Sequence, residues 1–209
     1  MKQAFFITGT DTGVGKTHVA CELMRQYIAQ GLKVVGMKPV VAGCELVNGE
    51  WVNEDVQKLI AAGNVVAPIE LINPYCFHEP IAPHLAAQKA NVEIKVDAIQ
   101  HAFSQLSELA DVVIVEGAGG FLVPLNDKET LADLASAFDI PIVLVVGIKL
   151  GCINHTLLTA EAIKARQLKL HGWIANHIEP NMLFAKENIV TIAKVLNMDC
   201  MFESAWQAA

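Results

Sequence analysis

Short, almost continuously apolar segments alternate along the chain with longer segments whose apolar positions recur at helical spacing. The segments of the first kind are predicted strands: 4–8, 33–37, 111–116, 141–147 and 172–176. Those of the second kind are predicted helices: 17–29, 54–62, 95–109, 129–138, 154–166 and 183–196. Strands without polar alternation are typical of parallel sheets covered on both faces. The alternation predicts an α/β fold, a doubly wound and mostly parallel sheet flanked by helices, in a single domain over residues 1–209.

One segment, NPYCFHEPIAPHLAA at 73–87, follows neither pattern. Its three prolines and two histidines interrupt any period, so we expect an ordered loop over the edge of the sheet. Long loops in compact domains often carry function, but a plain connection fits the sequence equally well. The sequence therefore leaves open whether His78 or His84 contacts a ligand.

The composition narrows the class of protein. Hydrophobic residues make up 53% and charged residues 18% of the chain, which favours a packed core over disorder. The longest strongly apolar run, residues 140–148, is too short to span a bilayer, and the N-terminal residues lack the features of a signal peptide. We therefore expect a cytoplasmic protein without a membrane partner. The net charge of −7 disfavours nonspecific binding to nucleic acid, which requires a basic surface.

The cysteines are scattered, odd in number and never spaced as C-x-x-C. They are Cys21, Cys44, Cys76, Cys152 and Cys200. This spacing predicts neither a disulfide framework nor a zinc site.

The clearest candidate chemistry lies in the glycine-rich segment FFITGTDTGVGKTHVA, between a predicted strand and a predicted helix. The usual phosphate-binding pattern is G-x-x-x-x-G-K-S/T, whereas here the first glycine, Gly9, stands one residue too early. Phosphate binding needs backbone N–H groups at a helix start rather than one fixed glycine, and Gly13 and Gly15 permit close approach. Lys16 is then placed for the β- and γ-phosphates, and Thr17 for Mg²⁺. We therefore predict a nucleotide phosphate site with a loop one residue longer than usual.

Two other nucleotide sites are disfavoured by the same region. A dinucleotide-binding G-x-G-x-x-G would need a glycine where His18 stands. It would also need an acidic residue after the second strand, which instead ends in Lys38-Pro39. No N-K-x-D element for guanine is present.

Charged residues at the ends of other strands are further candidates, each with a plainer alternative. Glu116 ends the predicted strand 111–116, where phosphate-loop enzymes hold Mg²⁺, but a simple exit from the strand fits too. Asp55 begins a predicted helix and is either a metal ligand or an N-cap. Lys38 and Lys149 either are solvated or face the crevice of Lys16. For Lys38 we expect the crevice if strands 4–8 and 33–37 lie close together in the sheet.

Together these motifs resemble the dethiobiotin synthetase family, the ATP-dependent carboxylating enzymes of biotin synthesis. The segments that carry the resemblance occur in family order: GTDTGVGKT (9–17), MKPV (37–40), NED (53–55), NPYCFHEPIAPH (73–84), VEGAGG (115–120), VVGIKLGCINHTLLT (145–159) and GWIAN (172–176). The resemblance implies a homodimeric ligase that uses Mg-ATP and CO₂ to convert 7,8-diaminononanoate (7,8-diaminopelargonate) into dethiobiotin, ADP and phosphate. It also implies a carbamate and a carbamic–phosphoric anhydride as intermediates.

The resemblance assigns roles to individual positions. Lys38 and Lys16 are the expected catalytic cations, and Thr17, Asp55 and Glu116 the expected metal ligands. The positions expected to bind ATP are Gly13, Val14, Gly15, Lys16, Thr17, His18, Asp55, Glu116, Gly117, Ala118, Gly119, Asn176 and His177. Those expected to bind the diamine, in part from the partner subunit, are Thr12, Ala42, Gly119, Leu150, Gly151, Cys152 and Asn154.

The chain departs from the family pattern in three places. Some members carry an acidic residue at the position of Gly13, and many have a serine or threonine at that of Ala42. By this resemblance, we expect the absence of that hydroxyl at Ala42 to weaken substrate binding by about 1 kcal/mol. The tail ends at ESAWQAA, before residues that contact the nucleotide in many members, so the preferred nucleoside triphosphate is left open.

Rival functions remain within and beyond the wider superfamily. An ATPase switch of the septum-site or partition type carries a lysine five residues before the loop lysine, where this chain has Asp11. A cobyrinate-type synthetase needs a fused glutaminase, for which 209 residues leave no room. A nucleotide-binding scaffold would bind ATP without turnover stimulated by a diamine.

Overall fold

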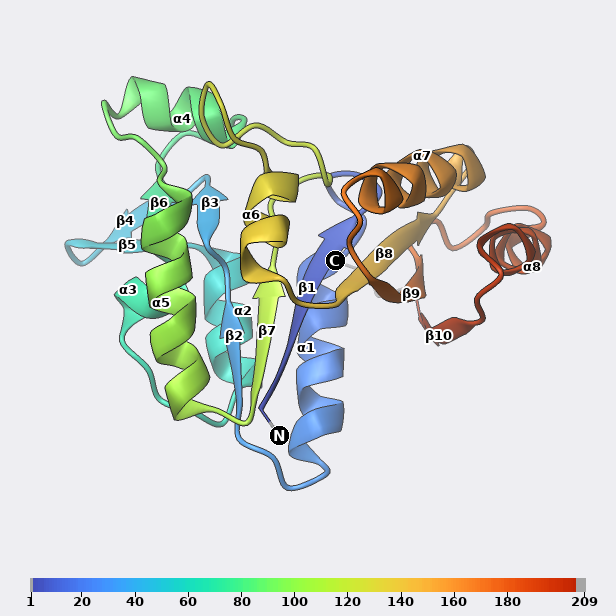
Figure 1. Cartoon of the computed structure of the whole chain (residues 1–209), viewed down its shortest axis with the longest axis horizontal. Coiled ribbons are helices and arrows are strands. Elements are labelled where there is room, and N and C mark those ends of the chain that lie inside the picture. The colour runs from blue at the N-terminus through green and yellow to red at the C-terminus, as the bar shows by residue number, and fades with distance from the viewer. Residues whose placement is uncertain (1, 206–209) are drawn as a thin grey trace.

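The computed structural model describes residues 2–205, and its centre is one sheet of six parallel strands (Figure 1). In sheet order the strands are β10 (Cys200–Ser204), β9 (Leu170–His177), β8 (Ile142–Ile148), β1 (Gln3–Gly9), β7 (Val112–Glu116) and β2 (Val34–Met37). Every residue of β7 and β8 is buried, as in strands covered on both faces. The predicted α/β fold with a mostly parallel sheet is confirmed.

Helices cover both faces of this sheet. The larger ones are α1 (Lys16–Ile28), α2 (Glu54–Ala62), α5 (Val96–Leu109), α6 (Leu131–Phe138), α7 (Cys152–Ala165) and α8 (Ala185–Leu196). Successive side chains of β1 point to opposite faces, so Phe6 packs with α5 and α6 whereas Phe5 and Ile7 pack with α1 and α2. A further core cluster joins α7 and α8 to β8 and β9.

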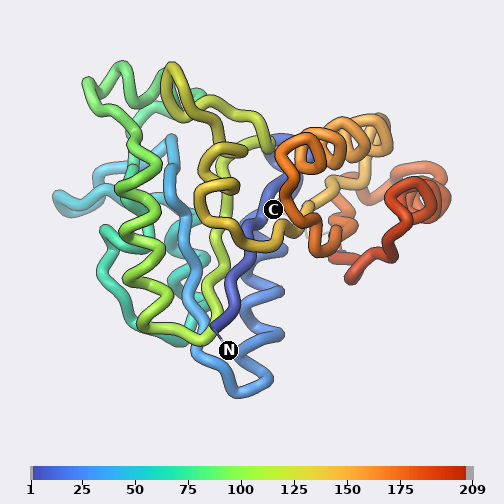
Figure 2. Tube along the Cα trace, in the orientation of Figure 1, coloured from blue at the N-terminus to red at the C-terminus, as the bar shows by residue number. Residues whose placement is uncertain are grey.

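A group of smaller elements lies at the β2 side of the molecule, where Figure 2 shows the hairpin of β4 and β5 projecting outward. It consists of β3 (Val40–Ala42) paired in parallel with β6 (Tyr75–Phe77), the antiparallel hairpin β4 (Glu45–Val47) and β5 (Glu50–Val52), α3 (Ile69–Ile72) and α4 (Pro83–Lys89). The expectation of a loop over 73–87 is therefore wrong in part, because β6 and α4 lie within it. Pro83 does not interrupt a helix but begins one, at a position where proline is well tolerated.

The expectation that the cysteines form no disulfide is also wrong. Cys44 and Cys76 are joined, with their Cα atoms 6.3 Å apart, whereas Cys21, Cys152 and Cys200 are free. The pairing of β3 with β6 places Val41 opposite Cys76 and so brings Cys44 close. Sequence spacing alone gives no sign of this register.

The predicted strands and helices are all present, with bounds within a few residues of those expected. β10 was not predicted, because its burial alternates and its apolar pattern is weak. The expected proximity of the strands 4–8 and 33–37 also needs correction, because β7 lies between β1 and β2. Within residues 2–205, no helix combines the length and the apolar character needed to cross a bilayer.

Candidate active site

A cleft of about 710 Å³ lies where the chain leaves β1, β2 and β7. Parallel strands bring their carboxyl ends to one edge of the sheet, and open α/β sheets bind ligands at this edge. The loop after β1, Lys38 after β2 and Glu116 at the end of β7 all line the cleft. The topology therefore gathers into one place residues that lie far apart in the sequence.

The loop between β1 and α1 has the conformation that its glycines allow. Gly13 and Gly15 adopt φ angles of 73° and 83°, in the left-handed region that favours glycine, and Gly15 is the N-cap of α1. Asn176, in β9, donates from Nδ2 to the Val14 carbonyl at 2.9 Å. The loop is thus tied to β9 as it turns into the helix.

Lys16 is the first residue of α1, and only 6% of its surface is exposed. Its Nζ donates to the Asp11 carbonyl at 2.9 Å. The pKa of Lys16 is lowered to about 8, chiefly by burial and also by the nearby charge of Lys38, against the opposing effect of Glu116. A bound polyphosphate would favour the charged form of this side chain.

A buried ionic cluster joins three elements on one wall of the cleft. Lys38 Nζ lies 2.5 Å from Glu116 Oε1 and 3.5 Å from Asp55 Oδ2, and it also faces the Gly117 carbonyl at 3.4 Å. Thr17 Oγ1 donates to the same Glu116 oxygen at 2.8 Å. Lys38 and Glu116 are only 4% and 1% exposed, so each is the main electrostatic partner of the other.

The residues expected to bind Mg²⁺ are brought together here, and one feature fits a cation. Glu116 Oε2 is buried, and no described residue hydrogen-bonds it. A buried carboxylate oxygen of this kind requires a donor or a metal ion. Across residues 2–205, no three histidine, cysteine or carboxylate side chains gather closely enough to form a metal site by themselves. A divalent ion would therefore also need the Thr17 hydroxyl and oxygens of its substrate.

Most of the predicted site residues line the cleft. They are Thr12, Gly13, Gly15, Lys16, Thr17, His18, Lys38, Ala42, Asp55, Glu116, Ala118 and Gly119. Gly119 has a φ of 67°, and a Cβ at this position would lie 3.4 Å from the Thr12 hydroxyl. The two segments expected to face the diamine therefore lie close together.

Other predicted residues lie beside the cleft rather than in its wall. His177 pairs with Glu203 of β10 at 2.9 Å, whereas His18, which does line the cleft, shares a hydrogen bond with Ser204 of the same strand. The positions at the start of α7, Leu150, Gly151, Cys152 and Asn154, are not among the described residues that line the cleft. Lys149, which precedes these positions, forms an ion pair with Asp11 of the phosphate loop at 3.3 Å. This ion pair connects the segment before α7 to the phosphate loop.

The segment 73–87 contributes residues other than its two histidines to the wall of the cleft. His78 binds the Cys44 carbonyl through Nδ1 at 3.0 Å, and neither His78 nor His84 lines the cleft, whereas residues 80–83 do. Residues 80–83, with Val41, Lys58 and Val123, were not singled out from the sequence. The resemblance at 73–84 pointed to the segment without indicating which of its residues reach the cleft.

The fold and the loop define a phosphate-loop nucleotide-binding protein. Residues 3–201 match the sequence profile of an AAA domain family. A solved ParA family ATPase from Chlorobium tepidum has the same fold, with a TM-score of 0.60 and 12% identity over 99% of this chain and 84% of that one. At that identity the likeness concerns the fold alone.

Two closer relatives identify the branch of this superfamily. The ATP-dependent dethiobiotin synthetase BioD of Nitrosospira multiformis is 52% identical over 96% of this chain and 86% of its own. That of Aromatoleum aromaticum is 52% identical over 92% and 85%. The chain belongs to the family of ATP-dependent dethiobiotin synthetases, which are ligases.

Proposed function

We propose that the protein converts 7,8-diaminononanoate (7,8-diaminopelargonate), CO₂ and Mg-ATP into dethiobiotin, ADP and phosphate. The observation that carries the proposal is that two buried lysines, Lys16 and Lys38, line one cleft together with a phosphate loop. The names of the 52% identical relatives support the use of ATP and the choice of product.

The proposed chemistry begins with one substrate amine adding to CO₂ to form a carbamate. A carbamate oxygen then attacks the γ-phosphorus of ATP, which releases ADP and leaves a carbamic–phosphoric anhydride. The second amine attacks the carbonyl carbon and expels phosphate, which closes the ureido ring. Because the second step joins two anions, the site must above all supply positive charge.

The two lysines are suited to different parts of this reaction. Lys16, held by the loop carbonyl of Asp11, would contact the β- and γ-phosphates. Lys38 lies on the wall that also carries Ala42 and Gly119, where the carbamate would bind. Its ammonium group would neutralise the attacking oxygen and the transferred phosphoryl group.

Thr17, Asp55 and Glu116 would hold Mg²⁺ together with phosphate oxygens. The ion would supply charge neutralisation at the β- and γ-phosphates. The protein's own contribution is to fix these oxygens: Thr17 and Lys38 both hold Glu116 Oε1, which leaves Oε2 directed away from them. Asn176 and His177, at the end of β9, would contact the adenine base.

A second copy of the chain would complete the substrate site. Leu150, two residues before α7, and Leu158, within α7, are 89% and 62% exposed. Apolar side chains exposed in this way favour contact with another protein surface. The positions 150–154, which lie off the cleft of their own chain, would reach the cleft of the partner and bind the far carboxylate of the diamine at a helix N-terminus.

A product assay tests the proposal. Purified protein is mixed with Mg-ATP, bicarbonate and 7,8-diaminononanoate, phosphate release is followed, and the organic product is identified by mass. Dethiobiotin formed in equal amount to phosphate is expected. Phosphate release that does not depend on the diamine would instead indicate an ATPase switch, and ATP binding without turnover would indicate a scaffold.

A further inference from the structure

The disulfide between Cys44 and Cys76 lies beside the proposed metal ligands but has no part in the chemistry proposed above. Cys44 follows β3, Cys76 lies in β6, and the two positions are 32 residues apart. The loop that the disulfide closes contains the hairpin of β4 and β5 and the whole of α2, which carries Asp55. The crosslink therefore restrains the segment that supplies one proposed metal ligand.

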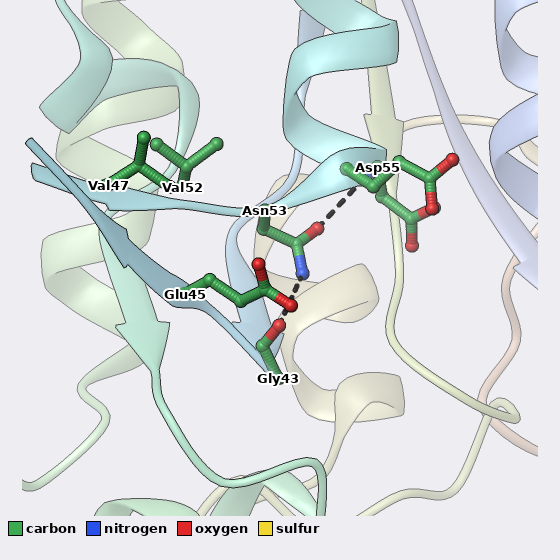
Figure 3. Close-up of a pocket in the computed structure, with 7 residues that line it drawn as sticks. Gly43, Glu45, Val47, Val52, Asn53 and Asp55 are labelled. Atoms are coloured by element: carbon green, nitrogen blue, oxygen red, sulfur yellow. Dashed lines mark hydrogen bonds between the residues drawn. The ribbon is translucent and has the colours of Figure 1, made fainter.

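A short path of hydrogen bonds leads from Gly43, the residue before Cys44, through Asn53 to Asp55, and Figure 3 shows it. Gly43, next to Cys44, accepts a bond through its carbonyl from Asn53 Nδ2 at 3.3 Å. Asn53 Oδ1 accepts in turn from the Asp55 backbone N–H at 3.0 Å, which caps α2. Asn53 thus joins the backbone beside the disulfide to the helix end that positions Asp55.

A cavity of about 480 Å³ lies between the hairpin and this helix end. Glu45, Val47 and Val52 line it on the hairpin side and Asp55 on the helix side (Figure 3). Glu54, the first residue of α2, also lines it. On this side the first turn of α2 faces the cavity, and the hydrogen bonds of Asn53 connect it to the backbone beside Cys44. The position of Asp55 therefore depends on how firmly the backbone next to Cys44 is held.

We propose that Cys44 and Cys76 form a reversible thiol–disulfide modification site that tunes Mg²⁺ binding through Asn53 and Asp55. The inference rests on the proposed metal role of Asp55. In the oxidised form the crosslink holds Gly43, and through it the first turn of α2. In the reduced form this restraint is lost and the affinity for Mg²⁺ with ATP falls.

The exchange requires a small thiol of the glutathione class. Cys76 is partly exposed whereas Cys44 is 1% exposed, so the incoming thiolate attacks the Cys76 sulfur. The disulfide bond breaks, Cys44 leaves as a thiolate and takes up a proton, and a mixed disulfide remains on Cys76. A second thiol releases Cys76 as a thiol and departs as the oxidised small molecule. Oxidation runs by the reverse steps, with two electrons passing to the small disulfide.

The first experiment compares the oxidised protein with protein reduced by dithiothreitol. Alkylation after denaturation counts free thiols, and three are expected in the oxidised form against five in the reduced form. Calorimetry then measures ATP binding as a function of Mg²⁺ concentration. The reduced protein is expected to need roughly ten times more Mg²⁺ for half-maximal binding, the effect typical of losing a group that orients a metal ligand. Its melting temperature should fall by about 5 °C or more.

Three variants separate the path from general destabilisation. Cys76→Ser should bind Mg²⁺ like the reduced wild type and no longer respond to dithiothreitol. Cys200→Ser, which removes a free and partly buried cysteine, should keep the full response. Asn53→Ser retains an N-cap hydroxyl but is too short to reach Gly43, so it should need more Mg²⁺ in both redox states while the disulfide still forms.

Two results would overturn the proposal. One is an unchanged Mg²⁺ dependence in protein shown to carry five free thiols. The other is the persistence of five thiols after treatment with oxidised glutathione. If Mg²⁺ binding responds to the redox state but no dethiobiotin forms in either state, the proposed reaction is wrong while the modification site stands.

Discussion

Two glycines of the phosphate loop provide a matched pair of substitutions. Gly13 and Gly15 both have φ angles in the left-handed region. A Cβ at Gly13 would meet no heavy atom within 4 Å, whereas a Cβ at Gly15 would overlap the side-chain amide of Asn176. Gly15→Ala therefore combines backbone strain with displacement of Asn176, and Gly13→Ala has the strain alone.

The expected loss of stability in each variant follows from these contacts. Left-handed backbone costs an alanine about 1–2 kcal/mol, and this applies to both variants. In Gly15→Ala the amide must also give up its buried hydrogen bond to the Val14 carbonyl, 2.9 Å long, which costs roughly 1–3 kcal/mol more. We expect Gly15→Ala to lower the free energy of unfolding by about 2 kcal/mol more than Gly13→Ala does.

Urea unfolding of the two variants and the wild type measures this difference. ATP binding by calorimetry provides a second measure, because Asn176 is the side chain proposed to contact the base. Gly15→Ala should weaken ATP binding at least tenfold relative to Gly13→Ala, about 1.4 kcal/mol of binding free energy. Equal effects of the two substitutions on both quantities would show that Asn176 does not hold the loop, and the reasoning would be refuted.

Three further predictions concern charge and capping. Because burial lowers the pKa of Lys16 to about 8, ATP affinity measured by calorimetry should fall about tenfold per pH unit above pH 8, as the neutral amine must regain a proton. Over the same range, up to the ordinary lysine pKa of 10.5, the free energy of unfolding without ATP should rise with pH, since the unfolded chain binds this proton more tightly. Lys38→Met should lower turnover about a hundredfold at saturating Mg²⁺. The control Lys58→Met, at an exposed position on the same cleft, should lower turnover far less. Equal losses of turnover in the two variants would contradict the role of Lys38. Thr130→Val removes the capping box with Asp133 at the start of α6. It should lower the free energy of unfolding, measured in urea, by about 1 kcal/mol and leave the ATP affinity unchanged. An altered ATP affinity would contradict this purely structural role of the cap.

The central fold could be predicted from the sequence because its signal is local. Strands such as β7 and β8 are buried on both faces, and their continuous apolar runs show this directly. β10 is an edge strand whose burial alternates, so its composition does not distinguish it from a loop. The order of the strands in the sheet could not be predicted from local sequence patterns, because it depends on where each crossover connection places the next strand.

The candidate site divides along similar lines. The loop residues Lys16 and Thr17 are contiguous with a strand and a helix, so their placement could be inferred from one segment. The disulfide could not be inferred in this way, because it depends on the register of β3 against β6, and its two cysteines are 32 residues apart in the sequence. The part of the cleft wall formed by residues 80–83 likewise depends on how α4 packs, which no local pattern reveals.

The position of β7 between β1 and β2 is what makes the ionic cluster possible. Glu116 ends β7, so its carboxylate meets Thr17 from the β1 side and Lys38 from the β2 side. The buried ammonium group of Lys38 is stabilised by a compensating charge, which Glu116 provides through one oxygen. The other oxygen stays without a partner among the described residues and suits a metal ion. One carboxylate on the strand between β1 and β2 can therefore hold the proposed catalytic cation through one oxygen and the proposed metal ion through the other.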